Sequence, residues 1–232
     1  DGDTNTNTGA KTDAFIGGDK GLDVKFMEGA PPQEVYDNNY PFNINVRLEN
    51  VGEEEIAANA AKITITGIDP NDFGNPVLEK RNEDILINAR RDPQGNELSG
   101  GISNVDFSGF QAEPLVGTVE FNVKADVCYP YATTVVSQVC ILEDLLGKTR
   151  RANEDTFCEV NGKKEYENSG APVHITKFEQ FATGQDKISF QFEISHVGEG
   201  KVYKLGTGCD SEISNREVIH VKVDTGMAGL SC

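Results

Sequence analysis

The sequence predicts an all-β protein built from two immunoglobulin-like or fibronectin-III-like antiparallel sandwiches. Three observations support this prediction. The chain has 232 residues, a length that suits two modules of roughly 100 to 120 residues better than one ordinary sandwich. From Gly21 onward, short runs of alternating apolar and polar residues are separated by Gly, Pro, Asn and Asp. Part of this pattern also occurs twice along the chain. A single larger unit is the alternative.

Residues 1–20 are predicted to form a flexible N-terminal tether, because they are rich in Asp, Asn, Thr and Gly. The only bulky apolar cluster in this tether consists of Ala14, Phe15 and Ile16. An apolar stretch in a flexible tail can add a strand to a neighbouring sheet.

The first sandwich is expected over residues 21–142. Its clearest strand is 41–50, in which Phe42, Ile44, Val46 and Leu48 alternate with polar residues. Seven strands in all are typical of an immunoglobulin-like sandwich. The other six are expected at 22–26, 62–68, 84–89, 102–107, 116–129 and 135–142.

Residues 143–169 are predicted to be a charged connector, with one short helix near 144–153. Twelve of the 26 residues from 143 to 168 are charged, and this stretch contains the turn pair Asn161-Gly162.

The second sandwich is expected over residues 170–232, with strands at 173–181, 187–196, 202–205 and 217–223. Along the second of these strands, apolar side chains alternate with polar ones. Four strands are too few to close a sandwich over this apolar row, so the second module is predicted to be incomplete. Either a longer natural chain or a strand from a neighbour completes it, and Ala14, Phe15 and Ile16 are the donation candidates. The apolar row consists of Ile188, Phe190, Phe192 and Ile194.

An internal repeat favours two related modules. Residues 46–56 align without a gap on residues 192–202, and each copy contains a strand, a Val-Gly corner, an acidic turn and a second strand. Upstream, the Gly-Ala-Pro at 29–31 is matched by another at 170–172. The common order of these features argues against coincidence.

The segments NVRLENVGEEE and QFEISHVGEGKV resemble the strand-corner-strand of CARDB-type cell-adhesion modules, a branch of the immunoglobulin-like sandwiches. Three longer runs, FIGGDKGLDVKFMEGAPPQEVYDNNYPFNINVRLENVGE, VCYPYATTVVSQVC and GAPVHITKF, resemble exported surface proteins of small-genome archaea. This resemblance implies an archaeal envelope protein of several modules, with relatives that run past the equivalent of Cys232. It implies no catalytic residues, because the group has no established activity.

Charge and hydropathy exclude several partners. The chain has 21 Lys and Arg against 38 Asp and Glu, a net charge of −17, which would repel nucleic acids and anionic lipids. Charged or polar residues interrupt every apolar stretch before the roughly 18 residues of a membrane span, so no transmembrane segment is expected. The chain starts at Asp1 without a leader, which suggests a mature exported protein.

Five cysteines without a C-x-x-C pair favour disulfides outside the cell over a zinc site. We predict Cys128–Cys140, facing each other across a hairpin, and Cys209–Cys232, tying down the C-terminus. The rival to the first bond is Cys140–Cys158. The rival to the second is that Cys232 pairs with a cysteine further along a longer natural chain, which leaves Cys209 free or bonded to Cys158.

No motif of a hydrolase, metalloprotease, P-loop or dinucleotide-binding site occurs. We therefore expect no enzymatic activity, no catalytic residues and no cofactor. His174, His196 and His220 all fall on predicted strands of the second sandwich, but their spacing favours separate residues over a metal site.

Two acidic segments are interpreted as loops rather than as catalytic sites. The segment 69–75 departs from the EF-hand pattern at Phe73 and Lys80, which leaves only a weak calcium site open. Glu53, Glu54 and Glu55 are consecutive at a turn, so a solvated corner is favoured over a catalytic pair of carboxylates.

The predicted function is that of an extracellular, non-enzymatic cell-surface component, structural or adhesive, in an envelope or surface filament. Its expected partners are other copies of itself or neighbouring envelope proteins. The alternative is a module that binds a carbohydrate or another surface ligand, which usually requires exposed aromatic rings. Trp is absent, and the aromatic candidates are Tyr36, Tyr40, Tyr129 and Tyr131.

Overall fold

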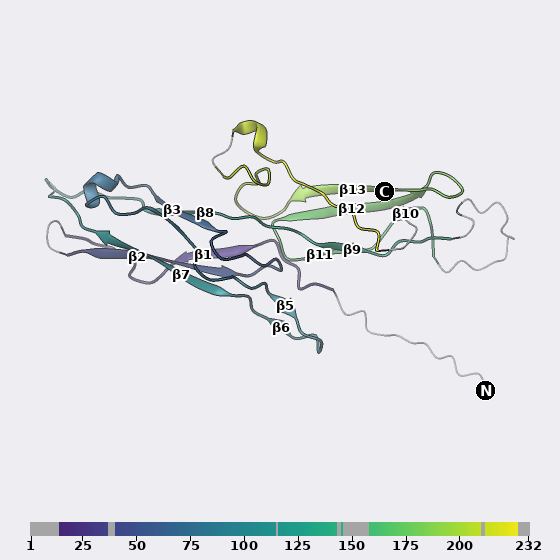
Figure 1. The fold of residues 1–232 in the computed structure, drawn as a ribbon, viewed down its shortest axis with the longest axis horizontal. Helices are drawn as coiled ribbons and strands as arrows, with labels where there is room; N and C mark the ends of the chain where they lie inside the picture. The colour runs from purple at the N-terminus through teal and green to yellow at the C-terminus, as the bar shows by residue number, and fades with distance from the viewer. Residues whose placement is uncertain are drawn as a thin grey trace.

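A computed structural model describes residues 14–36, 40–114, 116–142, 145, 158–209 and 212–226. Within these ranges the chain forms thirteen strands, two short 3-10 helices and no α-helix. The strands pair into several small antiparallel sheets. Figure 1 shows an elongated molecule with β2, β3, β7 and β8 in one half and β9 to β13 in the other. The prediction of an all-β protein is confirmed.

The first half contains two three-stranded sheets. One has the order β1 (Leu22–Phe26), β2 (Phe42–Asn50), β7 (Ile102–Phe110). The other has the order β4 (Glu79–Arg81), β3 (Lys62–Thr66), β8 (Lys124–Cys128). A small hairpin of β5 (Arg90–Arg91) and β6 (Glu97–Leu98) and the 3-10 helix η1 (Pro70–Phe73) complete this half.

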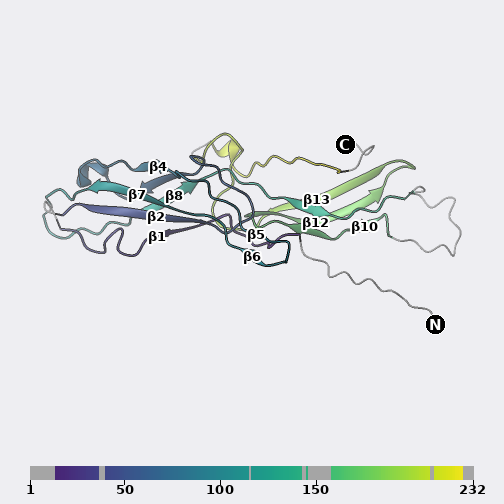
Figure 2. The same cartoon turned by 60° about the horizontal axis from the view of Figure 1, so that its bottom comes forward.

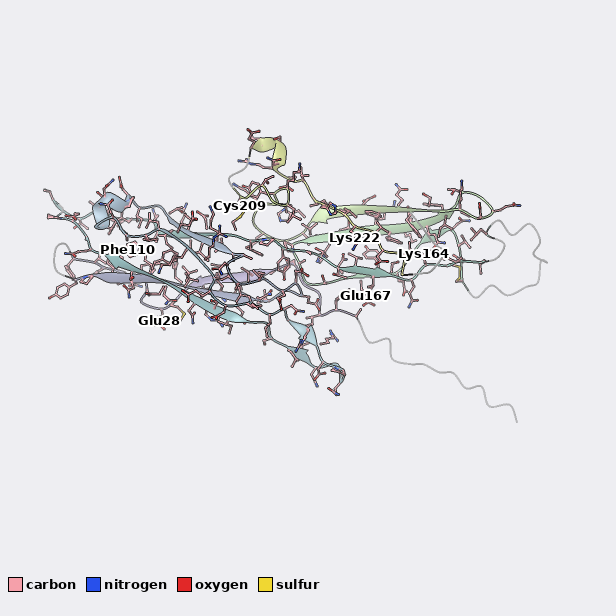
Figure 3. All side chains as sticks on the ribbon, viewed as in Figure 1. Glu28, Phe110, Lys164, Glu167, Cys209 and Lys222 are labelled. Atoms are coloured by element: carbon pink, nitrogen blue, oxygen red, sulfur yellow. A yellow bond between two sulfur atoms is a disulfide. The ribbon has the colours of Figure 1, made fainter. Side chains whose placement is uncertain are left out.

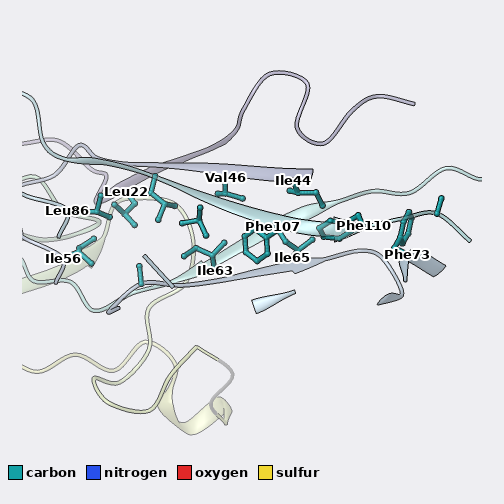
Figure 4. Packing of buried hydrophobic residues seen from close by; sticks show 14 residues of the cluster. Leu22, Ile44, Val46, Ile56, Ile63, Ile65, Phe73, Leu86, Phe107 and Phe110 are labelled. Atoms are coloured by element: carbon teal, nitrogen blue, oxygen red, sulfur yellow. The ribbon is translucent and has the colours of Figure 1, made fainter. Parts of the chain in front are cut away.

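A single hydrophobic core lies between these two sheets (Figure 4). Ile44, Val46 and Leu48 of β2 are fully buried, because the alternation of the strand turns every second side chain inward. Ile63 and Ile65 of β3 meet them from the opposite sheet. Burying an aliphatic or aromatic side chain of this size contributes about 1.5 to 3 kcal/mol, so this core stabilises the first half strongly.

The second half has less regular pairing. β9 (Val135–Ser137) pairs with β11 (Tyr166–Asn168), and β10 (Gly162–Lys163) pairs with β12 (Val173–Ala182). β12 forms a long hairpin with β13 (Ile188–His196), with a register shift between Ile175 and Lys177. The 3-10 helix η2 (Ile213–Asn215) follows. The buried cluster here is small and contains Cys140, Leu145 and Val160.

Five predicted strands differ from the structure. The strand expected at 116–129 shortens to β8 (Lys124–Cys128). Residues 84–89 form only the bridge between Leu86 and Ile56, and 202–205 form only the bridge between Tyr203 and Arg216. Residues 217–223 join no ladder among the described residues. The strand expected at 135–142 shortens to β9 and pairs with β11, so it belongs with the second half and not with the first. The predicted helix at 144–153 lies outside the described residues apart from Leu145.

Among the residues that the structure describes, no helix has the length and apolar character to cross a membrane.

Candidate functional site

The two halves of the molecule meet where the repeated sequence motif occurs. Main-chain hydrogen bonds join the first Val-Gly corner to both neighbouring segments: the N–H of Gly52 donates to the Gly21 carbonyl and that of Glu53 to the Gly170 carbonyl, each at 3.0 Å. The N–H of Ala171 donates to the Gly18 carbonyl at 3.1 Å. We call this region the junction; it comprises residues 16–22, 50–54, 129–131, 170–172 and 197–198.

Both Val-Gly corners require glycine because other main-chain atoms approach them closely. A Cβ at Gly52 would lie 2.1 Å from the Tyr131 hydroxyl oxygen and 2.6 Å from the Gly170 carbonyl oxygen. A Cβ at Gly198 would lie 2.2 Å from the carbonyl oxygen of Asp19 and 2.7 Å from Cβ of Pro172. The two corners of the repeat therefore contact the same second Gly-Ala-Pro segment, a convergence that the sequence did not predict.

The Glu53 carboxylate holds the junction together. Its Oε1 accepts the N–H of Ile16 at 2.9 Å, and its Oε2 accepts the N–H groups of Gly17 at 2.9 Å and Gly170 at 2.7 Å. Hydrogen bonds to an ionised acceptor are stronger than neutral ones. The prediction of a solvated acidic corner is therefore wrong for Glu53, and it holds only for Glu55, which is exposed.

Replacing Glu53 with alanine is expected to destabilise the protein by about 2 kcal/mol, because three main-chain donors lose a charged acceptor. The amides of Ile16, Gly17 and Gly170 should lose most of their protection from hydrogen exchange. The exposed neighbour Glu55→Ala is the matched control and should leave both measurements unchanged. Unchanged protection at the three amides in Glu53→Ala would contradict this role for the carboxylate.

Two tyrosines close the other side of the junction. The Tyr129 hydroxyl accepts the N–H of Leu22 at 3.1 Å. The Tyr131 hydroxyl accepts the N–H of Glu54 at 3.2 Å and donates to Oδ1 of Asn50 at 3.2 Å. The two rings meet edge to face, with centroids 5.6 Å apart. Burial raises the pKa of Tyr129 and raises the pKa of Tyr131 to about 12.

This burial decides which aromatic rings a ligand could reach. Tyr129 and Tyr131 are committed to the junction, whereas Tyr36 and Tyr40 are 66% and 69% exposed. Of the four aromatic candidates for stacking against a sugar, only the latter pair presents an open ring. Burial also raises the pKa of the carboxyl of Glu54, the residue whose main-chain N–H donates to the Tyr131 hydroxyl.

The raised pKa of Tyr131 predicts a loss of stability in alkali. A folded-state pKa of about 12 against 10 for an ordinary tyrosine means that the folded chain keeps a proton that the unfolded chain releases. The free energy of unfolding therefore has its full value below pH 10 and falls as the pH rises toward 12. Chemical denaturation at several pH values should show this fall, and Tyr131→Phe should make it shallower. The exposed control Tyr36→Phe should follow the wild type; a Tyr131→Phe profile as steep as the wild type would refute this assignment.

The disulfides differ from both predicted bonds. Cys128 pairs with Cys209, and Cys140 pairs with Cys158. The predicted Cys128–Cys140 bond is wrong because β8 pairs with β3 whereas β9 pairs with β11, so the hairpin that would place the two cysteines opposite each other does not form. The predicted Cys209–Cys232 bond is also wrong, since Cys209 is already bonded. The rival Cys140–Cys158 bond is the one that forms.

The other sequence candidates do not converge. Nε2 of His174 lies 3.1 Å from the Gly18 carbonyl oxygen, His196 ends β13 opposite Val173, and His220 is exposed further along the chain. Within the described part of the chain, no group of His, Cys, Asp and Glu side chains has the arrangement of a metal site. In the acidic loop, Asp69 caps η1 by accepting the N–H of Asn71.

The apolar tail cluster lies against its own chain. The N–H of Ala14 donates to the Glu167 carboxylate at 2.6 Å, and Ile16 is bound by Glu53 as described above. Phe15 and Ile16 are half-buried. Ile16 therefore belongs to the junction, whereas Ala14 is hydrogen-bonded to Glu167 outside it, so the donation candidates lie against their own chain in this structure.

The hairpin of β12 and β13 presents an apolar face that is poorly covered. Residues directly opposite each other on paired strands share a face, and the register pairs Phe178 with Phe192 and Ile175 with Ile194. Within this hairpin only Gln180 is buried, and its amide bonds the main chain of Cys140. The aromatic rings are half-buried, in contrast with the fully buried core of the first half.

The outer edge of β13 is open. β13 is the last strand in the order β10-β12-β13, so its outer N–H and C=O groups pair with no strand among the described residues. Exposed edges of this kind readily pair with a strand from another chain. The poorly covered face and the open edge together form the candidate interaction site of the protein.

Comparison of the chain with protein-family models, with curated proteins and with solved structures finds no match.

Proposed function

We propose that this protein is an extracellular, non-enzymatic building block of a cell envelope or surface filament, made of immunoglobulin-like modules of the CARDB type. It assembles with other copies of itself through its second module. Structure and adhesion, rather than catalysis, are its task.

The observation that carries this proposal is the exposed apolar face and open edge of the β12–β13 hairpin. A large apolar surface in contact with water is costly, and such surfaces usually mark a site of association. The exposed large side chains at this site include Ile194 at 36% on the apolar face and Val197 at 39% directly after β13. Association would cover them and pair the edge of the sheet.

Other features support this role. Two disulfides are typical of proteins that work in an oxidising compartment. The hydrogen-bonded junction holds the two halves in a fixed elongated arrangement (Figure 1), which suits a subunit that transmits force or spacing. A net charge of −17 keeps separate chains soluble until a specific contact forms.

A pair of substitutions on β13 tests this proposal. Phe192→Glu places a charge on the apolar face, and we expect it to abolish self-association of the full chain, measured by sedimentation velocity. Gln191→Glu is the matched control, because Gln191 lies on the opposite, polar face of the same strand. Thermal melting checks that both variants fold. A folded Phe192→Glu variant that associates like the wild type would refute the proposal.

A further inference from the structure

We propose that the segment 218–224 of one copy adds to the open edge of β13 in a second copy, as a fourth strand of the β10-β12-β13 sheet. The inference rests on the proposed function, since it names the part of the neighbour that completes the second module. It replaces the tail cluster Ala14–Ile16 as the donor, because Ala14 and Ile16 are hydrogen-bonded to Glu167 and Glu53 of their own chain.

The segment 218–224 has the composition of a β-strand, but it pairs with no strand among the described residues. Its sequence is VIHVKVD, rich in the β-branched residues that favour strands. It is non-helical throughout and joins no ladder within the described residues. Its apolar side chains are open to water: Ile219 is 40% exposed, Val221 46% and Val223 54%. An exposed, unpaired segment of this kind is a ready strand donor.

Three constraints keep the segment off the edge of its own β13. The bond between Cys128 and Cys209 ties the preceding chain to the end of β8. The N–H of Lys204 donates to the Asn215 carbonyl at 2.7 Å and that of Glu217 to the Val202 carbonyl at 2.9 Å, which fixes the entrance to the segment.

The third constraint is the turn at Glu217. This residue has a φ of +55°, a left-handed conformation that is uncommon for a residue with a side chain. It redirects the chain as the segment begins. In Figure 1 the segment passes across β12 and β13, and in Figure 2 it lies to one side of them. Figure 3 labels Cys209 near the middle of the long axis and Lys222 beside the strands of the second half.

The segment and the edge of β13 are complementary in pattern. In a strand, Ile219, Val221 and Val223 share one face, and would extend the apolar row of β13. The other face carries Val218, His220, Lys222 and Asp224, of which the three polar residues would extend the polar face of β13. The seven residues 218–224 fit within the nine residues of β13.

The charges on the polar face are also complementary. Nζ of Lys177 lies 3.0 Å from the Glu179 carboxylate and 3.7 Å from that of Glu193. The single positive charge of Lys177 is therefore close to both carboxylates, and Glu193 lies on the edge strand β13. A donated strand places both Lys222 and Asp224 on this face, and Lys222 supplies a second positive charge there. Donation from copy to copy in one direction would build a filament, and mutual exchange would build a closed dimer.

The test uses the full chain and proline, which cannot donate an N–H to a ladder. We expect Val221→Pro to raise the dissociation constant for self-association at least tenfold, without lowering the melting temperature of the monomer. Val116→Pro is the matched control. Val116 is also an exposed valine, and it precedes Gly117 with a φ of +90°, a position in a turn that tolerates proline. A synthetic peptide of residues 216–226 should compete with assembly of the wild type, and a scrambled peptide should not.

The outcomes separate the two proposals. Loss of association in Val221→Pro but not in Val116→Pro, with competition by the peptide, supports strand donation. If the wild-type chain associates and Val221→Pro associates equally well, the segment 218–224 is not the donor. The same holds if the peptide has no effect on assembly of the wild type. Either result overturns strand donation by this segment and leaves the proposed function standing. Equal loss in both proline variants also overturns it. A wild-type chain that never associates refutes both proposals.

Discussion

The double variant Cys128→Ser/Cys209→Ser is expected to lose about 4.5 kcal/mol of unfolding free energy, because the bond closes a long loop in the unfolded chain. The two cysteines are 81 residues apart, and the entropy that a cross-link removes from the unfolded chain grows with loop length. The same bond anchors the start of the C-terminal segment to β8. Denaturant unfolding without reductant measures the loss.

The second disulfide provides the internal comparison. Cys140–Cys158 closes a loop with a separation of only 18 residues, so removing it should cost less, about 3 kcal/mol. Cys232→Ser, which removes neither bond, is the control and should unfold like the wild type. If the Cys128→Ser/Cys209→Ser variant unfolds at the wild-type denaturant concentration, the connection between β8 and the C-terminal segment is not as described.

Gly52→Ala is expected to destabilise the protein by about 3 kcal/mol, because an added methyl group overpacks a buried site. The new Cβ would lie 2.1 Å from the Tyr131 hydroxyl oxygen and 2.6 Å from the carbonyl oxygens of both Gly170 and Lys20. Two of these three neighbours are main chain and cannot rotate away. The melting temperature should fall, and hydrogen exchange should accelerate on both sides of the junction.

The matched control for this variant is Gly184→Ala. A Cβ at Gly184 would make only ordinary contacts, the nearest being Cβ of Lys187 at 3.5 Å. The control should therefore melt within about 2 °C of the wild type. If Gly52→Ala and Gly184→Ala have the same melting temperature, the two halves do not meet at the Val-Gly corner.

The strands β2, β3 and β7 of the first half could be predicted because each has one buried face, whereas the short strands β4, β5 and β6 have none and were not predicted. Apolar and polar residues alternate in Phe42–Asn50 and in Leu22–Phe26, and both strands form where they were expected. Residues 84–89 instead contain the apolar run Ile85, Leu86 and Ile87, of which only Leu86 is buried as part of the core, and it makes one bridge to Ile56. Local alternation identifies a strand; it does not identify its partner.

Partners in the sheets and disulfides depend on contacts between distant parts of the chain. Cys128 and Cys140 are equidistant from a plausible turn, yet the intervening chain passes from one half of the molecule to the other. A hairpin and such a crossing look alike in sequence. The pairing of β9 with β11 is set by residues about thirty positions away, including the hydrogen bond from Ser169 N–H to the Thr134 carbonyl.

The junction was only partly visible in the sequence. The repeat identified both Val-Gly corners and the second Gly-Ala-Pro, and a glycine at a corner indicates that something approaches the main chain closely. What approaches, namely Lys20, Asp19 and Gly170, could be known only from the structure. The role of Glu53 was missed because its carboxylate accepts three main-chain N–H groups. Every residue except proline has such a group, so no side-chain pattern in the sequence indicates these bonds.

The native mass of the purified full chain, followed over a wide range of protein concentration, tests the central claim most directly. One chain has a mass of 25.2 kDa. We predict that the mass rises to multiples of this value as the concentration increases, and that the dilute protein binds a dye specific for exposed apolar surface. A mass of one chain at every concentration, without dye binding, would contradict the claim that the second module is completed by another copy.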